Sequence, residues 1–323
     1  MAASEQSLVQ PFDFASDVLH TKQRGLWTQA WQRLLHNRLA VISGAILLII
    51  ITVSLLADFV PAVQLHDPAT TDFSVIEQNP SWNHPLGTDR LGRDLYARMT
   101  QATLFSLKIG IGTQAVILLI GISVGMSAAL AGRLSDTVLM WITDLAFAFP
   151  DLLAIILLRQ VLFGRDWAII GSGDPQIPGV PSVLLVTVLA ISFVGWTTVS
   201  RLVRGQMLSI KEQDYILAAR ATGASPWRIV RAHMLPNTLS AVIVAATFGI
   251  PLAIFAEATL GFIGLGVPPP NASLGSLINS GLDSIQTHNI QLIWPTVMVA
   301  LLMLCFTFLG DGLRDALDPR TRR

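Results

Sequence analysis

The amino-acid sequence predicts an all-α integral membrane protein with six transmembrane helices, and two observations support this fold class. Hydrophobic residues make up 52% of the 323 residues and charged residues only 13%, whereas soluble domains carry about 25% charged residues. In addition, five long stretches contain no charged residue, and each is long enough to cross a bilayer core of about 30 Å as a helix. Together these observations argue against a water-soluble globular protein.

The first predicted span is Leu39–Ala57, which contains nineteen uncharged residues. At about 1.5 Å per residue this helix is about 28 Å long, close to the thickness of a bilayer core. The 38 residues before it are mostly polar and include Lys22, Arg24, Arg33 and Arg38. Such a segment is too long and too polar for a typical cleaved signal peptide, so we expect the first span to be retained.

Four further uncharged stretches predict the next spans. They are Ile109–Gly132, Pro175–Ser200, Ala232–Ala256 and Asn289–Gly310. A sixth candidate, Thr137–Phe163, is apolar but is interrupted by Asp144, Asp151 and Arg159. We include it because the chain would otherwise contain an unexplained apolar loop.

The distribution of basic residues predicts the orientation of the six spans. Fifteen Lys and Arg residues lie on the side that holds both termini, and five lie on the opposite side. Loops rich in Lys and Arg stay in the cytoplasm, so both termini are expected there. The predicted parts are a cytoplasmic N-terminal tail (1–38), a first transmembrane helix with an outer loop (39–101), a core of five helices (102–318) that includes an inner loop (201–236), and a cytoplasmic C-terminal tail (319–323).

Several classes of chemical site are excluded by the motifs that the sequence lacks. None of the lysines, Lys22, Lys108 and Lys211, lies in a phosphate-binding GxxxxGK[ST] loop. Cys305 is the only cysteine, which excludes an internal disulfide and a CxxC site. The six histidines form no HExxH motif and are scattered along the chain. The 21 basic residues balance the 21 acidic ones, so the chain has no net charge that would attract nucleic acid. From the missing motifs we predict no catalytic residue, cofactor or metal site.

A GxSxG match at Gly121, Ser123 and Gly125 allows two interpretations. In serine hydrolases this motif lies on a turn between a strand and a helix. Here it lies inside an uncharged helix, where the same glycines form GxxxG and allow two membrane helices to approach closely. We favour helix packing over a catalytic Ser123.

The inner loop contains residues that are typical of the beginnings and ends of helices. Tyr215–Thr222 contains good helix formers, and Gly223 follows as a C-terminal cap. Ser225 is then an N-cap with Pro226 in the first helical position. This second helix is expected to end at Pro236, which lacks a backbone donor. The loop is therefore predicted to form two short helices joined by a sharp turn.

Three interpretations of this helical loop are open. Ala218 and Ala219 give the first helix a nearly bare surface that fits closely into a cleft of another protein. Alternatively, the loop lies on the membrane with Trp227 and the arginines at the lipid headgroups. Binding to DNA is disfavoured, because the loop is short and both of its ends are tethered to spans.

A second amphipathic segment is predicted in the outer loop. It would begin after Gly87 with Thr88 as its N-cap. Oppositely charged residues four apart and an apolar stripe support a helix there. These residues are Asp89 with Arg93, Arg90 with Asp94, and Leu91, Leu95 and Met99. This helix would either serve as scaffold or help to receive an external partner protein, and we favour scaffold.

Acidic residues within the predicted spans are candidate functional groups, because a charge inside a membrane is costly. Glu257 lies in the fifth span, and Asp144 and Asp151 are seven residues apart in the third. Seven residues are two helical turns, so both aspartates would point the same way unless Pro150 bends the helix. They either line a pore or bond neighbouring helices, and we favour the structural role.

Five stretches give the sequence a specific resemblance. The inner loop resembles the EAA loop of bacterial ATP-binding-cassette (ABC) importer permeases, with Leu217 in place of the motif's Glu. The corresponding positions are Ala218, Ala219, Gly223, His233, Leu235 and Pro236, with His233 in place of the motif's Ile. The segment HPLGTDRLGRDLYARM looks like the signature of the second permease subunit of dipeptide, oligopeptide and nickel importers. LAFAFPDLL, ATLGFIGLGVPPP and DGLRDALDPR fit the same subfamily.

The resemblance implies a type I importer permease of the MetI-like fold, with one additional N-terminal span, in the bacterial inner membrane. Its expected partners are a second permease subunit forming a heterodimer, two cytoplasmic ATPases that carry ATP and Mg²⁺, an external solute-binding protein and the lipid bilayer. The chain itself would carry no cofactor and catalyse no reaction.

The resemblance also implies a site and a cargo. The residues expected to couple the chain to the ATPases are Asp214, Tyr215, Ala218, Ala219, Arg220, Gly223, Ala224, Ser225, His233 and Pro236. The solutes would be dipeptides, oligopeptides or related compounds such as nickel chelates. The alternative is a stand-alone secondary transporter or channel that uses Asp144, Asp151 and Glu257.

Overall fold

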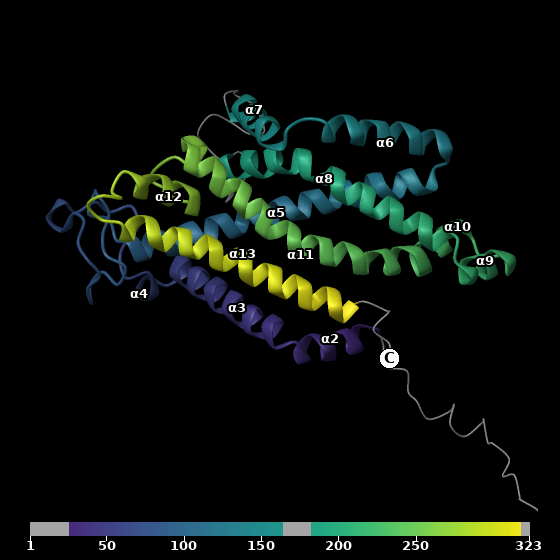
Figure 1. Cartoon of the computed structure of the whole chain (residues 1–323), viewed down its shortest axis with the longest axis horizontal. Coiled ribbons are helices and arrows are strands. Elements are labelled where there is room, and N and C mark those ends of the chain that lie inside the picture. Colours follow the sequence, from purple (N-terminus) through teal and green to yellow (C-terminus); the bar gives the residue numbers. More distant parts are fainter. Residues whose placement is uncertain (1–25, 164–181, 318–323) are drawn as a thin grey trace, which may run out of the picture.

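The structure is a computed structural model that describes residues 26–163 and 182–317, and it is built from helices (Figure 1). The helices are α2 (Leu26–His36), α3 (Arg38–Phe59), α4 (Pro61–Gln64), η1 (Phe73–Val75), α5 (Leu95–Leu130), α6 (Arg133–Phe147), α7 (Asp151–Phe163), α8 (Ser182–Lys211), α9 (Asp214–Ala221), α10 (Pro226–Ile229), η2 (Val230–Met234), α11 (Leu235–Leu260), η3 (Gly261–Leu265), α12 (Leu274–Leu282) and α13 (Ile290–Leu317). Within these residues the only β-type pairing is an isolated bridge between Thr88 and Asp94.

Five helical segments are long and apolar enough to cross a membrane, and they match the five clear predicted spans. They are α3, α5, α8, the continuous segment Pro226–Leu265 and α13. The predicted start of the third of these stretches, at Pro175, lies outside the described residues, as do residues 1–25 and 318–323. The predicted N-terminal tail is partly helical, because α2 occupies its last turns.

The helix α5 begins at Leu95, fourteen residues before the predicted start of its span. Asp94 is the N-cap, and its Oδ1 accepts a hydrogen bond from the Ala97 N–H at 2.8 Å. The first turns contain Arg98 and Lys108. A search for uncharged stretches therefore places the start of this helix too late.

The sixth predicted span is not one continuous helix. It is divided into α6 and α7, whose axes differ by 89° across a short break. Pro150 lies in this break, where its missing N–H and its ring oppose a continuous helix. Because of this bend Asp144 and Asp151 do not share a helix face, and the prediction that both point the same way is wrong.

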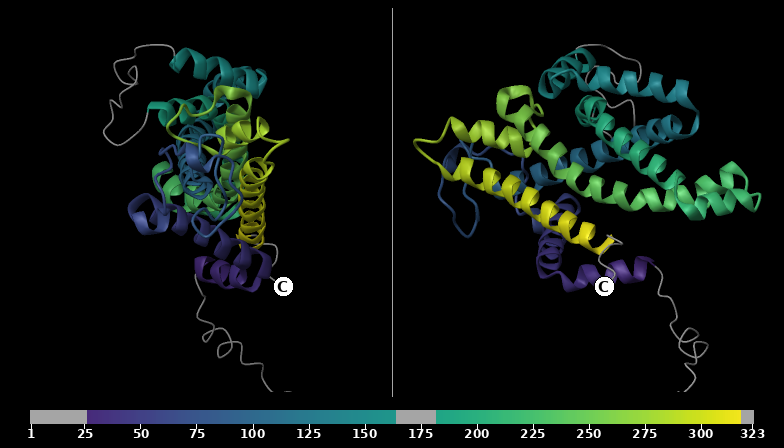
Figure 2. Two further views of the ribbon diagram at one scale, coloured as in Figure 1. Left: turned by 90° about the vertical axis from the view of Figure 1, so that its left-hand side faces the viewer. Right: turned by 45° about the vertical axis from the view of Figure 1, so that its right-hand side comes forward.

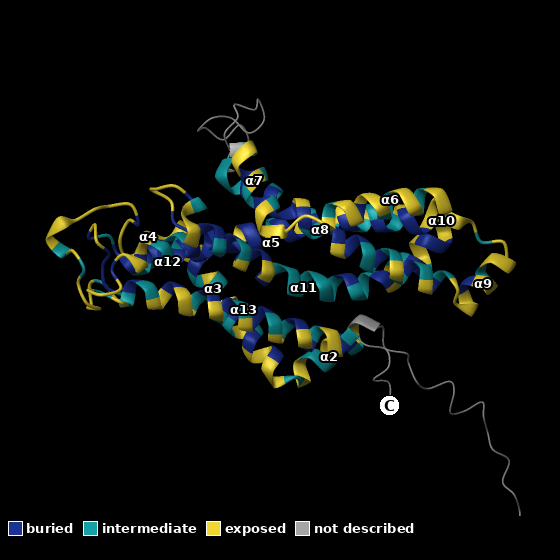
Figure 3. Cartoon of the chain, turned by 45° about the horizontal axis from the view of Figure 1, so that its top comes forward, coloured by how far each residue is buried: buried dark blue, intermediate teal, exposed yellow. Residues whose placement is uncertain are grey.

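The two central helices, α5 and α8, pack against each other along their lengths and are the most deeply buried (Figure 3). A Cβ atom placed on Gly121 would lie 2.7 Å from the Val199 Cβ, and one on Gly125 would lie 2.4 Å from the Ser200 carbonyl oxygen. Neither position has room for a side chain. The packing interpretation of the GxxxG glycines is confirmed.

Ser123 lies between these glycines in the middle of α5. Its Oγ donates a hydrogen bond to the Leu119 carbonyl oxygen one turn earlier, at 2.6 Å. The strand-turn-helix geometry of a nucleophile elbow is not present at this site, so the hydrolase interpretation of Ser123 is wrong.

The bundle has two different ends (Figures 1 and 2). We call the segment Asp214–Met234, which contains α9, α10 and η2, the hairpin; it projects at one end. The opposite end is formed by the segment Val60–Asp94 together with α12, and we call it the loop end. The layer of α13, α3 and α2 packs beside α11 and α5 between these ends.

The predicted amphipathic helix of the outer loop is not formed. Thr88 and Asp94 pair as an isolated bridge, and the residues between them form a turn in which Gly92 has a φ of 71°. The Asp89 N–H donates to the Arg93 carbonyl oxygen at 3.0 Å. The predicted ion pair of these two residues is present, at 2.7 Å, but it closes a turn instead of stapling a helix.

Candidate functional site

The hairpin is attached to the bundle by buried apolar side chains, of which Ile216 is the one on α9. Ile216 has no exposed surface. It belongs to a hydrophobic cluster that joins α8, the hairpin and α11. Other members of this cluster are Met207, Ile210, Val203, Ile229, Val230, Met234 and Val242. Burial of one Ile side chain contributes about 1.5–3 kcal/mol. The hairpin is therefore packed against both α8 and α11.

The turn of the hairpin is set by Gly223, as the sequence predicts. Its φ of 83° lies in the left-handed region that favours glycine. The Gly223 N–H donates to the Arg220 carbonyl oxygen, and the Ala224 N–H donates to the Ala219 carbonyl oxygen, both at 3.0 Å. These two bonds form a Schellman motif. The turn is therefore fixed by its own backbone.

The second half of the hairpin begins as predicted and ends differently. Ser225 is the N-cap, accepting a bond from the Arg228 N–H, and Pro226 opens the helix. The helix does not end at Pro236 but continues into α11. The Leu235 N–H bonds to the Val230 carbonyl oxygen five residues earlier, in a π-helical turn. This wider turn lets the chain pass Pro236 without breaking.

Most of the predicted coupling residues are on the surface of the hairpin. The exposed ones are Asp214, Tyr215, Ala218, Arg220, Gly223, Ser225 and Pro236, and the partly buried ones are Ala219, Ala224 and His233. The rings of Tyr215 and His233 lie 6.3 Å apart, so the two arms of the hairpin meet there. The predicted residues form one contiguous structural unit.

Two exposed apolar side chains extend this surface beyond the predicted set. Leu217 is 51% exposed and Trp227 is 68% exposed. Leu217 is next to the anchoring Ile216 and therefore points away from the bundle. Each of these large apolar residues lies outside the buried stripe of its helix and is available for contact with another surface.

The acidic residues of the third and fifth spans lie elsewhere and contact neighbouring helices. Asp144 accepts a bond from the Arg201 guanidinium of α8 at 2.8 Å. Glu257 is buried, and its Oε2 accepts a bond from the Ser106 hydroxyl of α5 at 2.7 Å. Asp151 is exposed at the start of α7. The structure does not bring these three residues together into one site.

Comparison with protein-family models shows which family this chain is similar to. A family model described as "Binding-protein-dependent transport system inner membrane component" matches residues 118–323, which include the hairpin. A second one, described as "N-terminal TM domain of oligopeptide transport permease C", matches residues 25–83.

Individual relatives are similar over nearly the whole chain. The oligopeptide transport system permease protein OppC of Bacillus subtilis is 35% identical over 308 residues, which are 95% of this chain and 94% of the relative. The dipeptide transport system permease protein DppC of the same organism is 38% identical over 91% and 86% of the two chains. OppC of Escherichia coli K12 is 34% identical over 95% of both chains.

A solved structure supports the fold. A chain of the MetNI methionine ABC transporter in an inward-facing conformation matches with a TM-score of 0.53 and 20% sequence identity. The match covers 68% of this chain and 96% of that chain. The predicted MetI-like core is therefore confirmed.

Proposed function

The chain belongs to the family of binding-protein-dependent transport system inner membrane components, and on this premise we propose that it is the transmembrane permease subunit of an ABC importer for peptides. The observation that carries the proposal is the similarity to OppC and DppC permeases over more than nine-tenths of the chain. As a multi-pass permease of this family it belongs to an inner membrane and contains no catalytic residue. Its solutes are dipeptides and oligopeptides, or related solutes such as nickel chelates.

The hairpin is the part that receives work from the ATPase subunits. Ala218 and Gly223 provide a surface without bulky side chains, and Leu217 and Trp227 provide apolar contacts beside it. Small residues allow close approach, and exposed apolar residues favour a partner surface over water. This combination fits a cleft in another protein better than it fits solvent.

Motion of the hairpin is passed to the spans by rigid connections. Ile216 joins α9 to the cluster between α8 and α11, and Pro226–Leu265 is one continuous helical segment. When the ATPases close on ATP, the hairpin moves as a body and tilts both helices. Alternating access then follows from two packed arrangements whose populations depend on the nucleotide.

The assembly contains further subunits. One partner is a second permease chain, with which this chain forms a heterodimer around the translocation path. Two ATPase subunits bind ATP and Mg²⁺ on the side of the hairpin, and a solute-binding protein docks at the loop end. The hairpin and both termini are then cytoplasmic, in agreement with the excess of basic residues on that side.

The proposal is tested by reconstitution. The chain is inserted into vesicles with its partner permease and the ATPases, and uptake of a labelled dipeptide and a labelled pentapeptide is measured with the binding protein outside. Uptake should require ATP hydrolysis and each subunit. Accumulation by vesicles that contain this chain alone would contradict the proposal and favour a stand-alone transporter.

A further inference from the structure

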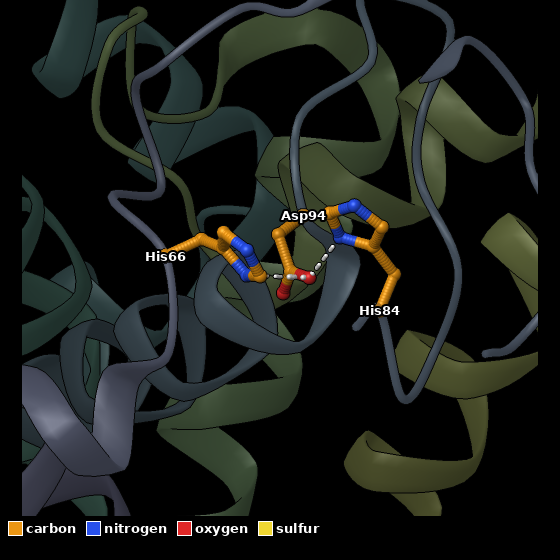
Figure 4. A group of neighbouring side chains, drawn as sticks. All are labelled: His66, His84 and Asp94. Atoms are coloured by element: carbon orange, nitrogen blue, oxygen red, sulfur yellow. Dashed lines mark hydrogen bonds and ion pairs between the residues drawn. The ribbon is translucent and has the colours of Figure 1, made fainter. Parts of the chain in front are cut away.

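Three metal-ligating side chains converge at the loop end, far from the hairpin (Figure 4). The His84 Nδ1 lies 2.7 Å from the Asp94 Oδ2, and the His66 Nδ1 lies 3.3 Å from the same oxygen. The two imidazole rings are stacked with their centroids 4.7 Å apart. All three ligand atoms lie within 4.8 Å of one another.

The three side chains come from different segments, and each is held by its backbone. His66 follows α4, where Leu65 has a φ of 66°. His84 lies in a turn in which its carbonyl oxygen accepts bonds from the Ser81 and Gly87 N–H groups, both at 2.9 Å. The three side chains therefore come together only in the folded loop, and no short sequence motif predicts their cluster.

Asp94 is oriented in a way that leaves one carboxylate oxygen for the histidines. Its Oδ1 accepts the capping bond from the Ala97 N–H at 2.8 Å, and its side chain is only 1% exposed. Carboxylate ligands of metals are commonly fixed by such a second hydrogen bond. Only Oδ2 then faces His66 and His84.

The cluster is close to the size of a site for a tetrahedral ion such as Zn²⁺. Nitrogen and oxygen ligands lie about 2.0–2.2 Å from Zn²⁺, so neighbouring ligands are about 3.3 Å apart. The separation of the His66 and Asp94 atoms is already 3.3 Å. The His84 and Asp94 atoms are 2.7 Å apart in a hydrogen bond, which a bound ion would replace as the two atoms separate. The side chain of His66 is 43% exposed, so solvent can reach the site and supply a fourth ligand.

We propose that His66, His84 and Asp94 form a binding site for a divalent transition-metal ion such as Zn²⁺. Imidazole nitrogens select such ions over Mg²⁺ and Ca²⁺, which prefer sets of oxygen ligands. The ion links the segment after α4 to the start of α5 and stabilises the loop end. The site is independent of the transport proposal, because it shares no residue with the hairpin.

The test is direct binding of Zn²⁺ to the full chain in lipid nanodiscs, purified without a histidine tag and stripped with a chelator. Calorimetric titration should give one Zn²⁺ per chain. His66→Gln and His84→Gln should each weaken the affinity at least tenfold, since even residues that only support a metal ligand contribute about 10–100-fold. His36→Gln, a histidine outside the cluster, is the matched control and should bind as the unchanged chain does.

Thermal unfolding supplies a second readout. Zn²⁺ should raise the unfolding temperature of the unchanged chain and of His36→Gln, but not that of His66→Gln. His66 is half-exposed, so this variant should fold. The proposal is overturned if the folded, unchanged chain binds no Zn²⁺, if His66→Gln binds it equally well, or if excess Mg²⁺ displaces it.

Discussion

The hairpin and the loop end differ in where their side chains find partners. At the loop end, Thr88 donates to the Val75 carbonyl oxygen and accepts from the Gln78 N–H, and the side chain of Gln291 donates to the Thr88 carbonyl oxygen. On the hairpin, the apolar side chains of Leu217 and Trp227 are exposed. Large apolar side chains are also exposed at the loop end, among them Phe73 and Trp82. The two ends therefore differ in the hydrogen bonds that hold them together within the chain, and not in exposed apolar surface.

The same contrast appears in their glycines. Gly92 and Gly223 both have positive φ values, 71° and 83°. A Cβ atom on Gly92 would lie 1.7 Å from the Asp72 carbonyl oxygen, whereas one on Gly223 would meet nothing within 4 Å. The first glycine is required by packing inside the chain and the second only by its backbone conformation. The difference teaches that packing within the chain constrains the turn at Gly92 but leaves the surface at Gly223 open.

The largest effect is expected for Gly92→Ala at the loop end. The added methyl group collides with backbone and cannot be relieved by a side-chain rotation. We expect destabilisation of at least about 3 kcal/mol and a large loss of folded protein. Thermal unfolding and the yield of monodisperse protein in detergent measure it. A normal unfolding temperature would contradict the claim that packing within the chain requires a glycine at position 92.

Glu257 tests whether the internal polar contacts are structural or line a pore. Glu257→Leu leaves the Ser106 hydroxyl without its acceptor and should cost about 1–3 kcal/mol. Glu257→Gln retains an acceptor and should leave both stability and peptide uptake nearly unchanged. Loss of uptake in a stable Glu257→Gln variant would instead assign this residue to the translocation path.

Gly223→Val addresses the turn of the hairpin. A side chain in the left-handed region costs about 1–2 kcal/mol, and the hairpin lies outside the main bundle. The amount of inserted protein should therefore remain normal, while ATP-driven uptake falls about tenfold, the equivalent of 1.4 kcal/mol. Uptake and ATP hydrolysis are measured on the same vesicles. Normal uptake would show that the shape of the turn is not needed.

The smallest effect is expected for Arg90→Gln. Arg90 is half-exposed and lies 3.5 Å from Glu77 and 3.8 Å from Asp283. Exposed ion pairs contribute about 0–1 kcal/mol because solvent screens them. The unfolding temperature should thus change little. A large decrease would mean that surface ion pairs, and not the buried contacts, stabilise the loop end.

Much of the fold could be predicted from the sequence, because a bilayer imposes length and polarity on each span. The positions of five spans and the capping residues Gly223 and Ser225 follow from such local rules. Local rules fail to predict a helix end where another feature of the folded chain moves that end. The π-helical turn carries the helix past Pro236, and the Asp94 cap starts α5 ahead of its uncharged stretch.

The hairpin and the metal-site cluster also differ in how far they could be predicted from the sequence. The hairpin residues are close in sequence, so their grouping in one structural unit could be predicted, while their coupling role stays a prediction. The cluster of His66, His84 and Asp94 could not, because its members lie in separate segments that only the folded loop brings together. The prediction that the chain has no metal site rested on the missing HExxH motif and on the scatter of the histidines, and it did not consider convergence of separate segments in the folded loop.

The central claim is that ATPase subunits bind the hairpin surface. Ala218 is exposed on α9, and Ala62 is exposed on α4 at the loop end, so a Trp at either position meets no packed core. Ala218→Trp should abolish copurification of the ATPases with the permease, and Ala62→Trp should leave it intact. Retention of the ATPases by a correctly inserted Ala218→Trp variant would contradict the account.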